Sequence, residues 1–166
     1  MSAYPRKVLL ATDGSEDSIR AAHAAIAIAG SADSELHIVH VGQAPAPQAG
    51  ASAARPPLPG EPSGYAEKEA RKLLEGQAKT VEAAGGKVSE THLRLGQPGA
   101  EVISVAAEID ADMIVVGSGG PRPVRRAVAA TTRRAALGRA SDIIVRSAHC
   151  PVLIVRGDAA LDDEGF

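Results

Sequence analysis

The sequence predicts an α/β fold: a single doubly wound sheet of five parallel strands with helices on both faces. Two observations support this fold class. Five short apolar runs alternate along the chain with four stretches of helical periodicity, an order typical of a parallel sheet. The 166 residues are 45% hydrophobic but only 2% aromatic, so the core is aliphatic and suits small-residue helices packed on a sheet. This length and apolar content predict one domain with a substantial core.

Charge and cysteine content exclude several classes of protein. The net charge of −2 does not steer the molecule toward nucleic acid or an acidic membrane surface. The single cysteine, Cys150, has no internal disulfide partner, which predicts a reducing, cytoplasmic location. There is no long apolar run before Val8, and no run approaches the ~18 apolar residues of a membrane span. We therefore expect neither a signal peptide nor a membrane protein.

The first half of the chain predicts two strands and two helices. The expected elements are a strand over 7–12, a helix from the N-cap Ser15 to a stop at Gly30, a strand over 35–41, and a helix from near Tyr65 to Gly85-Gly86. Between the last two lies a mobile loop over 42–64, in which Pro, Ala, Gly and Ser dominate. It is interpreted as a loop within the domain because neither flank could fold alone.

The second half continues the alternation. The expected elements are a third strand over 88–95, at an edge because its polarity alternates, a helix over 99–110, a strand over 113–116, a helix over 141–148 and a strand over 151–156. A second loop, 121–137, separates the fourth strand from the last helix. The domain spans 1–157, and 158–166 is expected to form a flexible acidic tail.

This topology locates a site. In the strand order 3-2-1-4-5 the winding reverses beside the first strand, so a crevice opens between the C-terminal ends of the first and fourth strands. Those ends are Ala11-Thr12-Asp13 and Gly117-Ser118. Asp13 would suit the base or sugar end of a nucleotide, since a carboxylate repels phosphate. The alternative is that Asp13 merely starts the turn into the helix.

Glycines on both sides of the second loop predict an anion site. Gly117-Ser118-Gly119-Gly120 follows the fourth strand, and Gly138-Arg139-Ala140-Ser141 precedes the last helix. Free N–H groups at a helix N-terminus attract phosphate, so the two segments together would hold the phosphates of a nucleotide. Ordinary loop glycines are the alternative. The chain contains neither a G-x-x-x-x-G-K-[ST] motif nor a complete G-x-G-x-x-G after the first strand.

Three segments resemble the universal stress protein family: KVLLATDGSEDS (7–18), MIVVGSGG (113–120) and LGRASDIIVRSAHCPVLIVR (137–156). The resemblance implies a Rossmann-like fold of the adenine nucleotide alpha hydrolase type, bound ATP, ADP or AMP, Mg²⁺ accompanying ATP, and a homodimer formed through 151–156. Nucleotide-binding members carry G-2x-G-9x-G-[ST], which Gly117, Gly120 and Gly138 match in part. The resemblance implies as binding residues Ala11, Thr12, Asp13, Val41, Val116, Gly117, Gly120, Gly138 and Ser141. The glycine segments add Ser118, Arg139 and Ala140 to the predicted binding residues.

Two departures from that motif concern the second loop. Between Gly120 and Gly138 lie 17 residues instead of nine, and Arg139 stands where the family has Ser or Thr. Arg139 either contacts phosphate or fills the pocket. The loop carries five arginines: Arg122, Arg125, Arg126, Arg133 and Arg134. It closes over a triphosphate, engages an acidic partner, or is simply solvated; nucleic acid is not expected, because no aromatic residues interleave with the arginines.

No catalytic or metal site is expected. His37 and His40 face opposite sides of their strand, and His23, His92 and His149 are isolated in the sequence. Cys150 is interpreted as a structural thiol, because no His–Asp pair accompanies it.

The sequence thus predicts a sensing or regulatory protein that binds an adenine nucleotide and at most hydrolyses ATP weakly. Two alternatives stay open. One is a universal stress protein that binds no nucleotide and acts through protein contacts. The other is an enzyme of the ATP pyrophosphatase kind, because DGSEDS (13–18) faintly resembles the S-G-G-x-D-S loop of those enzymes. In that comparison Asp13 and Ser15 replace the first Ser and the second Gly.

Overall fold

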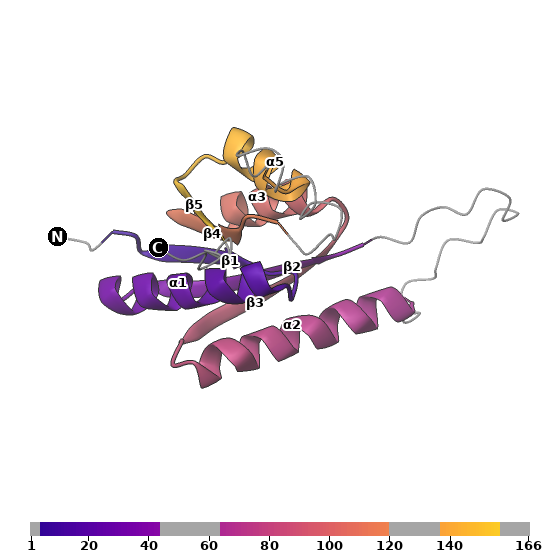
Figure 1. Cartoon of the computed structure of the whole chain (residues 1–166), viewed down its shortest axis with the longest axis horizontal. Coiled ribbons are helices and arrows are strands. Elements are labelled where there is room, and N and C mark those ends of the chain that lie inside the picture. The colour runs from indigo at the N-terminus through magenta and orange to yellow at the C-terminus, as the bar shows by residue number, and fades with distance from the viewer. Residues whose placement is uncertain (1–3, 44–63, 120–136, 157–166) are drawn as a thin grey trace, which may run out of the picture.

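The computed structural model, which describes residues 4–43, 64–119 and 137–156, contains one five-stranded parallel sheet with the order β3-β2-β1-β4-β5 (Figure 1). The strands are β1 (Lys7–Ala11), β2 (Glu35–Gly42), β3 (Val88–Leu95), β4 (Met113–Gly117) and β5 (Val152–Val155). The helices are α1 (Glu16–Ala32), α2 (Tyr65–Ala83), α3 (Pro98–Glu108) and α5 (Arg139–Ser147). The predicted fold class and strand order are confirmed.

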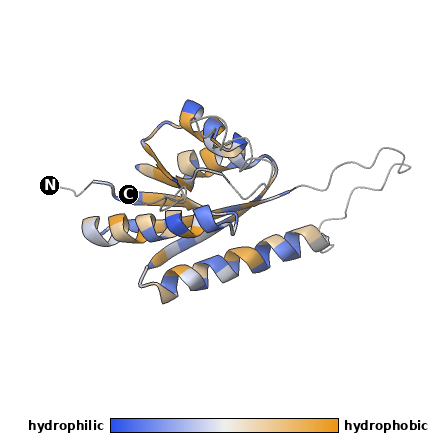
Figure 2. Cartoon of the chain, in the orientation of Figure 1, coloured by the Kyte–Doolittle hydropathy of each residue, from blue (hydrophilic) through white to orange (hydrophobic). Residues whose placement is uncertain are grey.

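Helices cover both faces of the sheet, and each face has its own hydrophobic core. Side chains alternate along β1, so Val8 and Leu10 pack with α1 and α2, whereas Leu9 packs with α3 and α5. Val8, Leu9 and Leu10 are at most 1% exposed, as expected for a central parallel strand. Figure 2 shows that the central strands are largely hydrophobic, whereas the edge strand β3 carries several hydrophilic residues.

The element boundaries agree with the sequence prediction to within two residues, and two of the two-residue differences have clear reasons. Helix α1 does not stop at Gly30 but continues to Ala32, and Asp33 ends it in the left-handed conformation with a φ of 53°. Asp tolerates this conformation, so the chain needs no glycine there. Helix α5 begins at Arg139, two residues before the predicted start at Ser141. The N-cap Ser15 is confirmed, since its hydroxyl accepts a hydrogen bond from the Ser18 N–H at 3.2 Å.

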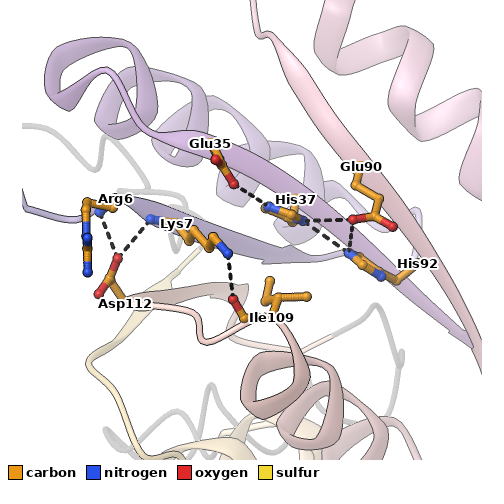
Figure 3. Close-up of polar contacts among 8 residues, drawn as sticks. All are labelled: Arg6, Lys7, Glu35, His37, Glu90, His92, Ile109 and Asp112. Carbon is orange, nitrogen blue, oxygen red and sulfur yellow. Dashed lines mark hydrogen bonds and ion pairs between the residues drawn. The ribbon is translucent and has the colours of Figure 1, made fainter.

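Polar contacts fasten the N-terminal end of the sheet (Figure 3). The carboxylate of Asp112, just before β4, accepts hydrogen bonds from the backbone N–H groups of Lys7 and Arg6 at 3.0 and 2.9 Å. The Lys7 N–H, followed by that of Arg6, lowers the pKa of Asp112 against the opposing effect of partial burial. The Lys7 ammonium donates to the carbonyl of Ile109, at the C-terminal end of α3, at 3.0 Å.

The described residues cover only part of the predicted organisation. Positions 44–63 of the first predicted loop, 120–136 of the second, and the tail lie outside them. None of the described helices has the length and apolar character that a membrane crossing requires.

Candidate functional site

A cleft of about 730 Å³ opens between the C-terminal ends of β1 and β4, where the sheet topology predicts a site. Its walls come from the ends of β1, β2 and β4 and from the starts of α1, α3 and α5. These six elements meet there because the winding of the sheet reverses beside β1. The cleft is large enough for a nucleotide-sized ligand, since small-molecule sites span roughly 300–1,000 Å³.

The floor of the cleft is apolar and continuous across three strands. Ala11 is in register with Val39 of β2 on one side and with Val116 of β4 on the other. All three side chains line the cleft, and Val102 of α3 adds to them. Because these residues are small or β-branched, they offer a low surface on which a planar apolar group can lie.

Two hydrogen bonds join the glycine segments on either side of the second loop. The Gly138 N–H donates to the carbonyl of Ser118 at 2.7 Å. The Ser141 hydroxyl, which is buried, donates to the carbonyl of Gly117 at 2.8 Å. The end of β4 and the start of α5 are thus neighbours, although the 17 residues between Gly120 and Gly138 exceed the family's nine.

Gly117 also allows β4 to pack closely against α1. A Cβ at this position would lie 2.8 Å from the backbone carbonyl carbon of Asp17 and 2.9 Å from its Cβ, closer than real side chains approach. The next residue, Ser118, uses this proximity: its hydroxyl donates to the Asp17 carboxylate at 2.9 Å. The requirement for glycine at 117 therefore comes from helix packing as well as from any ligand.

The N-terminus of α5 faces the cleft without a capping side chain. Gly138 is the N-cap residue, and it carries no side chain to accept from the first N–H groups of the helix. The first such group bonded within the helix is that of Asp142, which donates to Gly138. The N–H groups of Arg139, Ala140 and Ser141 thus have no acceptor within the helix and are available to bind an anion. Arg139 is exposed and lines the cleft.

The β1 end of the cleft is held by an internal polar network. Thr12 is buried, and its hydroxyl donates to Gln77 of α2 at 3.1 Å. Its carbonyl accepts from the buried His40 at 2.8 Å. Asp13 is exposed and lines the cleft, while its carboxylate accepts from the Ser15 N–H at 2.9 Å. Asp13 therefore stabilises the turn into α1, and its other carboxylate oxygen remains available to a ligand.

Most of the predicted binding residues meet in this one cleft. Ten line it: Ala11, Thr12, Asp13, Val41, Val116, Gly117, Gly138, Arg139, Ala140 and Ser141. Ser118 does not line it, because its hydroxyl is turned toward Asp17. Gly120 lies outside the described residues.

Sequence reasoning missed the wall that α3 contributes. Gln97, Pro98 and Gly99 line the cleft at the first turn of this helix. A Cβ on Gly99 would lie 2.7 Å from the Cβ of Ile143, so this glycine lets α3 and α5 approach each other. The sequence did carry a signal for this wall: at the predicted start of the helix, a glycine directly follows a proline.

The histidines differ from expectation in one respect. His92 is not isolated: its Nε2 atom lies 3.2 Å from Nδ1 of His37 on the neighbouring strand, and the two rings stack at 5.4 Å. Burial is the main cause that lowers the pKa of His92, outweighing the opposing charge of Glu90. The prediction that His92 is isolated was wrong, because the pairing of β2 with β3 brings together two histidines that are 55 positions apart in the sequence.

Cys150 lies half-buried beside β5. Desolvation, followed by the charge of Asp112, raises the pKa of its thiol. Because the thiol form is favoured, the geometry gives no sign of an activated nucleophile.

The sequence and fold of this chain are similar to those of known proteins. Residues 5–156 match the model of the universal stress protein family. Universal stress protein MJ0531 of Methanocaldococcus jannaschii is 31% identical over 156 residues, covering 91% of this chain and 82% of the relative. Universal stress protein YxiE of Bacillus subtilis is 33% identical over 154 residues, covering 90% and 98%. The crystal structure of a universal stress protein in complex with cAMP is similar with a TM-score of 0.62 at 25% identity, covering 93% of this chain and 98% of that one.

Proposed function

Because this chain belongs to the universal stress protein family, we propose that it binds an adenine nucleotide, ATP or its shorter forms ADP and AMP, between the ends of β1 and β4. One observation carries the proposal. The uncapped N-terminus of α5 borders the same cleft as the apolar floor around Ala11 and Val116. A nucleotide needs both, since its base is planar and weakly polar and its phosphates are anionic.

The pose follows from the chemistry of the two ends. The base lies over Ala11 and Val116, near Val41, and Asp13 accepts from the base or the ribose. The phosphates meet the N–H groups of Ala140 and Ser141, and the exposed Arg139 adds a charge-assisted contact. With ATP, Mg²⁺ would accompany the phosphates. A relative 25% identical to this chain has been crystallised with cAMP, which supports an adenine nucleotide as the ligand class.

The chemistry of the cleft favours sensing or regulation over turnover. Among the described lining residues Asp13 is the sole carboxylate, and the Ser15 N–H already occupies one of its oxygens. No second acid accompanies it there to coordinate metal or activate water. An acid also stands at the position where the ATP pyrophosphatases have the first Ser of their loop, which disfavours pyrophosphate binding at that turn. We therefore expect a bound nucleotide to be held, with hydrolysis slow at most.

The test is nucleotide binding by the purified protein. Denaturing it without prior treatment should release an adenine nucleotide, identified by chromatography and mass spectrometry. Added ATP with Mg²⁺ should raise the melting temperature of nucleotide-free protein. Ligand at 100 times its dissociation constant stabilises the native state by about 2.7 kcal/mol. Product formed at many turnovers per minute would contradict the regulatory assignment and favour an enzyme.

Ala140→Asp separates loss of binding from loss of folding. An acidic side chain in the first turn of α5 favours the helix but repels phosphate. We expect this variant to keep its unliganded melting temperature and to lose most of the shift caused by ATP. The matched control is Ala66→Asp, the same change at the same position of α2, which lies outside the cleft. If neither variant nor wild type responds to any nucleotide, the proposal fails and a role through protein contacts is favoured.

We also propose that the protein forms a homodimer through β5. Within the described residues β5 pairs with β4 alone, so its other edge is open. Leu153 on this strand is 36% exposed, although its neighbours Val152 and Ile154 pack on the core. An open apolar edge favours pairing with another strand, and a second copy of β5 is a self-complementary partner.

A further inference from the structure

A cluster of three metal-ligating side chains lies on β2 and β3, away from the cleft (Figure 3). We propose that Nδ1 of His37, Nε2 of His92 and Oε2 of Glu90 bind one divalent transition-metal ion of the zinc class. None of the three residues lines the nucleotide cleft, so this proposal does not depend on the proposed function.

The distances between the three atoms match those of a small metal ion. The two histidine nitrogens are 3.2 Å apart, and Oε2 of Glu90 lies 3.9 Å from the His37 atom and 4.0 Å from the His92 atom. A point equidistant from all three lies about 2.2 Å from each, at the upper end of zinc–ligand bonds of roughly 2.0–2.2 Å. An ion therefore fits after shifts of a few tenths of an ångström.

A register shift in the sheet creates the cluster. Leu36 pairs with Val88, but the next residue, His37, pairs with Glu90, so β3 carries one extra residue at this point. Side chains alternate along a strand, so without the shift Glu90 and His92 would point to the face opposite His37. Such irregularities re-aim side chains and are common beside functional sites.

A second carboxylate orients the His37 ring. Oε2 of Glu35 lies 3.3 Å from Nε2 of His37, on the far side of the ring from the cluster. If this nitrogen carries the proton and donates it to Glu35, Nδ1 keeps a free lone pair for the ion. Metal-binding histidines almost always have such a partner on the other ring nitrogen.

Burial and charge also suit an ion. The side chains of His37 and His92 are only 6% and 11% exposed, so packing fixes both rings. Glu90 is 62% exposed and can rotate in to close the site, leaving a fourth position open to water. The nearby cation Arg94 is paired with Glu108 of α3, so its charge is largely compensated.

The ligand set selects the class of ion. Two imidazoles and one carboxylate favour zinc and its first-row neighbours, whereas Mg²⁺ and Ca²⁺ prefer oxygen ligands throughout. The bound ion would bridge β2 to the edge strand β3. It would stabilise the native state, because the unfolded chain does not hold the three ligands together.

The proposal is tested on the full chain stripped of metal with a chelator. Zn²⁺, measured by competition with a chromogenic chelator, should bind one ion per chain and raise the melting temperature. Co²⁺ should give the visible absorption of a four-coordinate ion, which Zn²⁺ then abolishes. Failure to find one tight Zn²⁺ per chain would overturn the proposal and leave a hydrogen-bonded histidine pair.

Variants show whether the bound ion occupies this cluster. Glu90→Gln should fold normally, because the side chain is exposed, and should weaken Zn²⁺ binding at least tenfold. His92→Gln should do the same, and Glu35→Gln should weaken binding roughly tenfold, as for other outer partners. The controls are Glu75→Gln on α2 and His23→Gln on α1, both exposed, which should bind as wild type does. Unchanged binding in Glu90→Gln and His92→Gln, or loss in His23→Gln, would overturn the assignment.

Discussion

The hydroxyl of Ser141 donates a 2.8 Å hydrogen bond to the carbonyl oxygen of Gly117, across 24 positions of sequence. Both groups are buried, so this bond ties the first turn of α5 to the last residue of β4. The same first turn presents its free N–H groups to the cleft. Together with the hydrogen bond from the Gly138 N–H to the Ser118 carbonyl, the bond from Ser141 holds the proposed phosphate site in place relative to the sheet.

Ser141→Ala should lower the free energy of unfolding by about 1–3 kcal/mol, because the Gly117 carbonyl would be left buried without a donor. It should also weaken ATP binding, since α5 loses its anchor to β4. Urea denaturation and thermal shift with ATP measure the two effects. Ser147→Ala, at the exposed end of the same helix, is the control and should change stability by less than about 0.5 kcal/mol. Equal stability of the two variants would contradict the anchoring role.

Gly117→Ala should destabilise the protein by about 1–3 kcal/mol, because the added Cβ overlaps the backbone of Asp17 and must push α1 away from β4. Gly76→Ala is the matched control: this glycine lies within α2 with no atom near its would-be Cβ. That change should instead stabilise the protein by about 0.5–1 kcal/mol. Thermal denaturation of both variants in the absence of nucleotide checks the difference in sign. A neutral Gly117→Ala would mean that α1 yields at little cost.

The architecture could be predicted because each of its determinants is local in the sequence. Runs such as that of Val8 to Leu10 are apolar at every position, which specifies strands buried on both faces. The alternation of strands and helices then leaves few strand orders, and the position of the cleft follows from the order. The apolar floor at Ala11 and Val116 and the glycine segment at Gly138 that precedes the last helix were thus within reach of sequence reasoning.

What could not be predicted depends on contacts between distant segments. The register shift after Leu36 turns Glu90 and His92 toward His37, and periodicity along one strand gives no sign of it. The start of α5 at Arg139, two residues before the predicted Ser141, also depends on a contact with a distant segment. The hydrogen bond from Gly138 to Ser118 fixes where this helix can begin, and no local signal marks that partner.

Asp112 should make stability depend on acid pH. Because hydrogen bonds from Lys7 and Arg6 lower its pKa in the folded state, the unfolded chain binds the proton more readily. Its stabilising contribution is therefore complete above the ordinary pKa of an aspartate, about 4, and is lost as the pH falls through the lowered folded value. Asp112→Asn should remove this part of the acid dependence and cost about 1 kcal/mol near neutral pH, a small value because the site is half-exposed.

Urea denaturation between about pH 3 and pH 7 measures the dependence. The control is Glu75→Gln on the exposed face of α2, which should leave the acid limb of the stability profile as in wild type. Superimposable pH profiles for Asp112→Asn and wild type would show that the negative charge of Asp112 contributes nothing to stability.

Leu153→Asp should convert the proposed dimer into a monomer. A carboxylate on the open edge of β5 would meet its own copy across a two-fold axis, where like charges repel and the apolar contact is lost. Size-exclusion chromatography with light scattering should give twice the chain mass for wild type and the single chain mass for the variant. The control is Val145→Asp on α5, which changes another exposed apolar residue, 45% exposed against 36% for Leu153. It should remain dimeric. A monomeric wild type, or a dimer that Leu153→Asp does not affect, would exclude β5 as the contact.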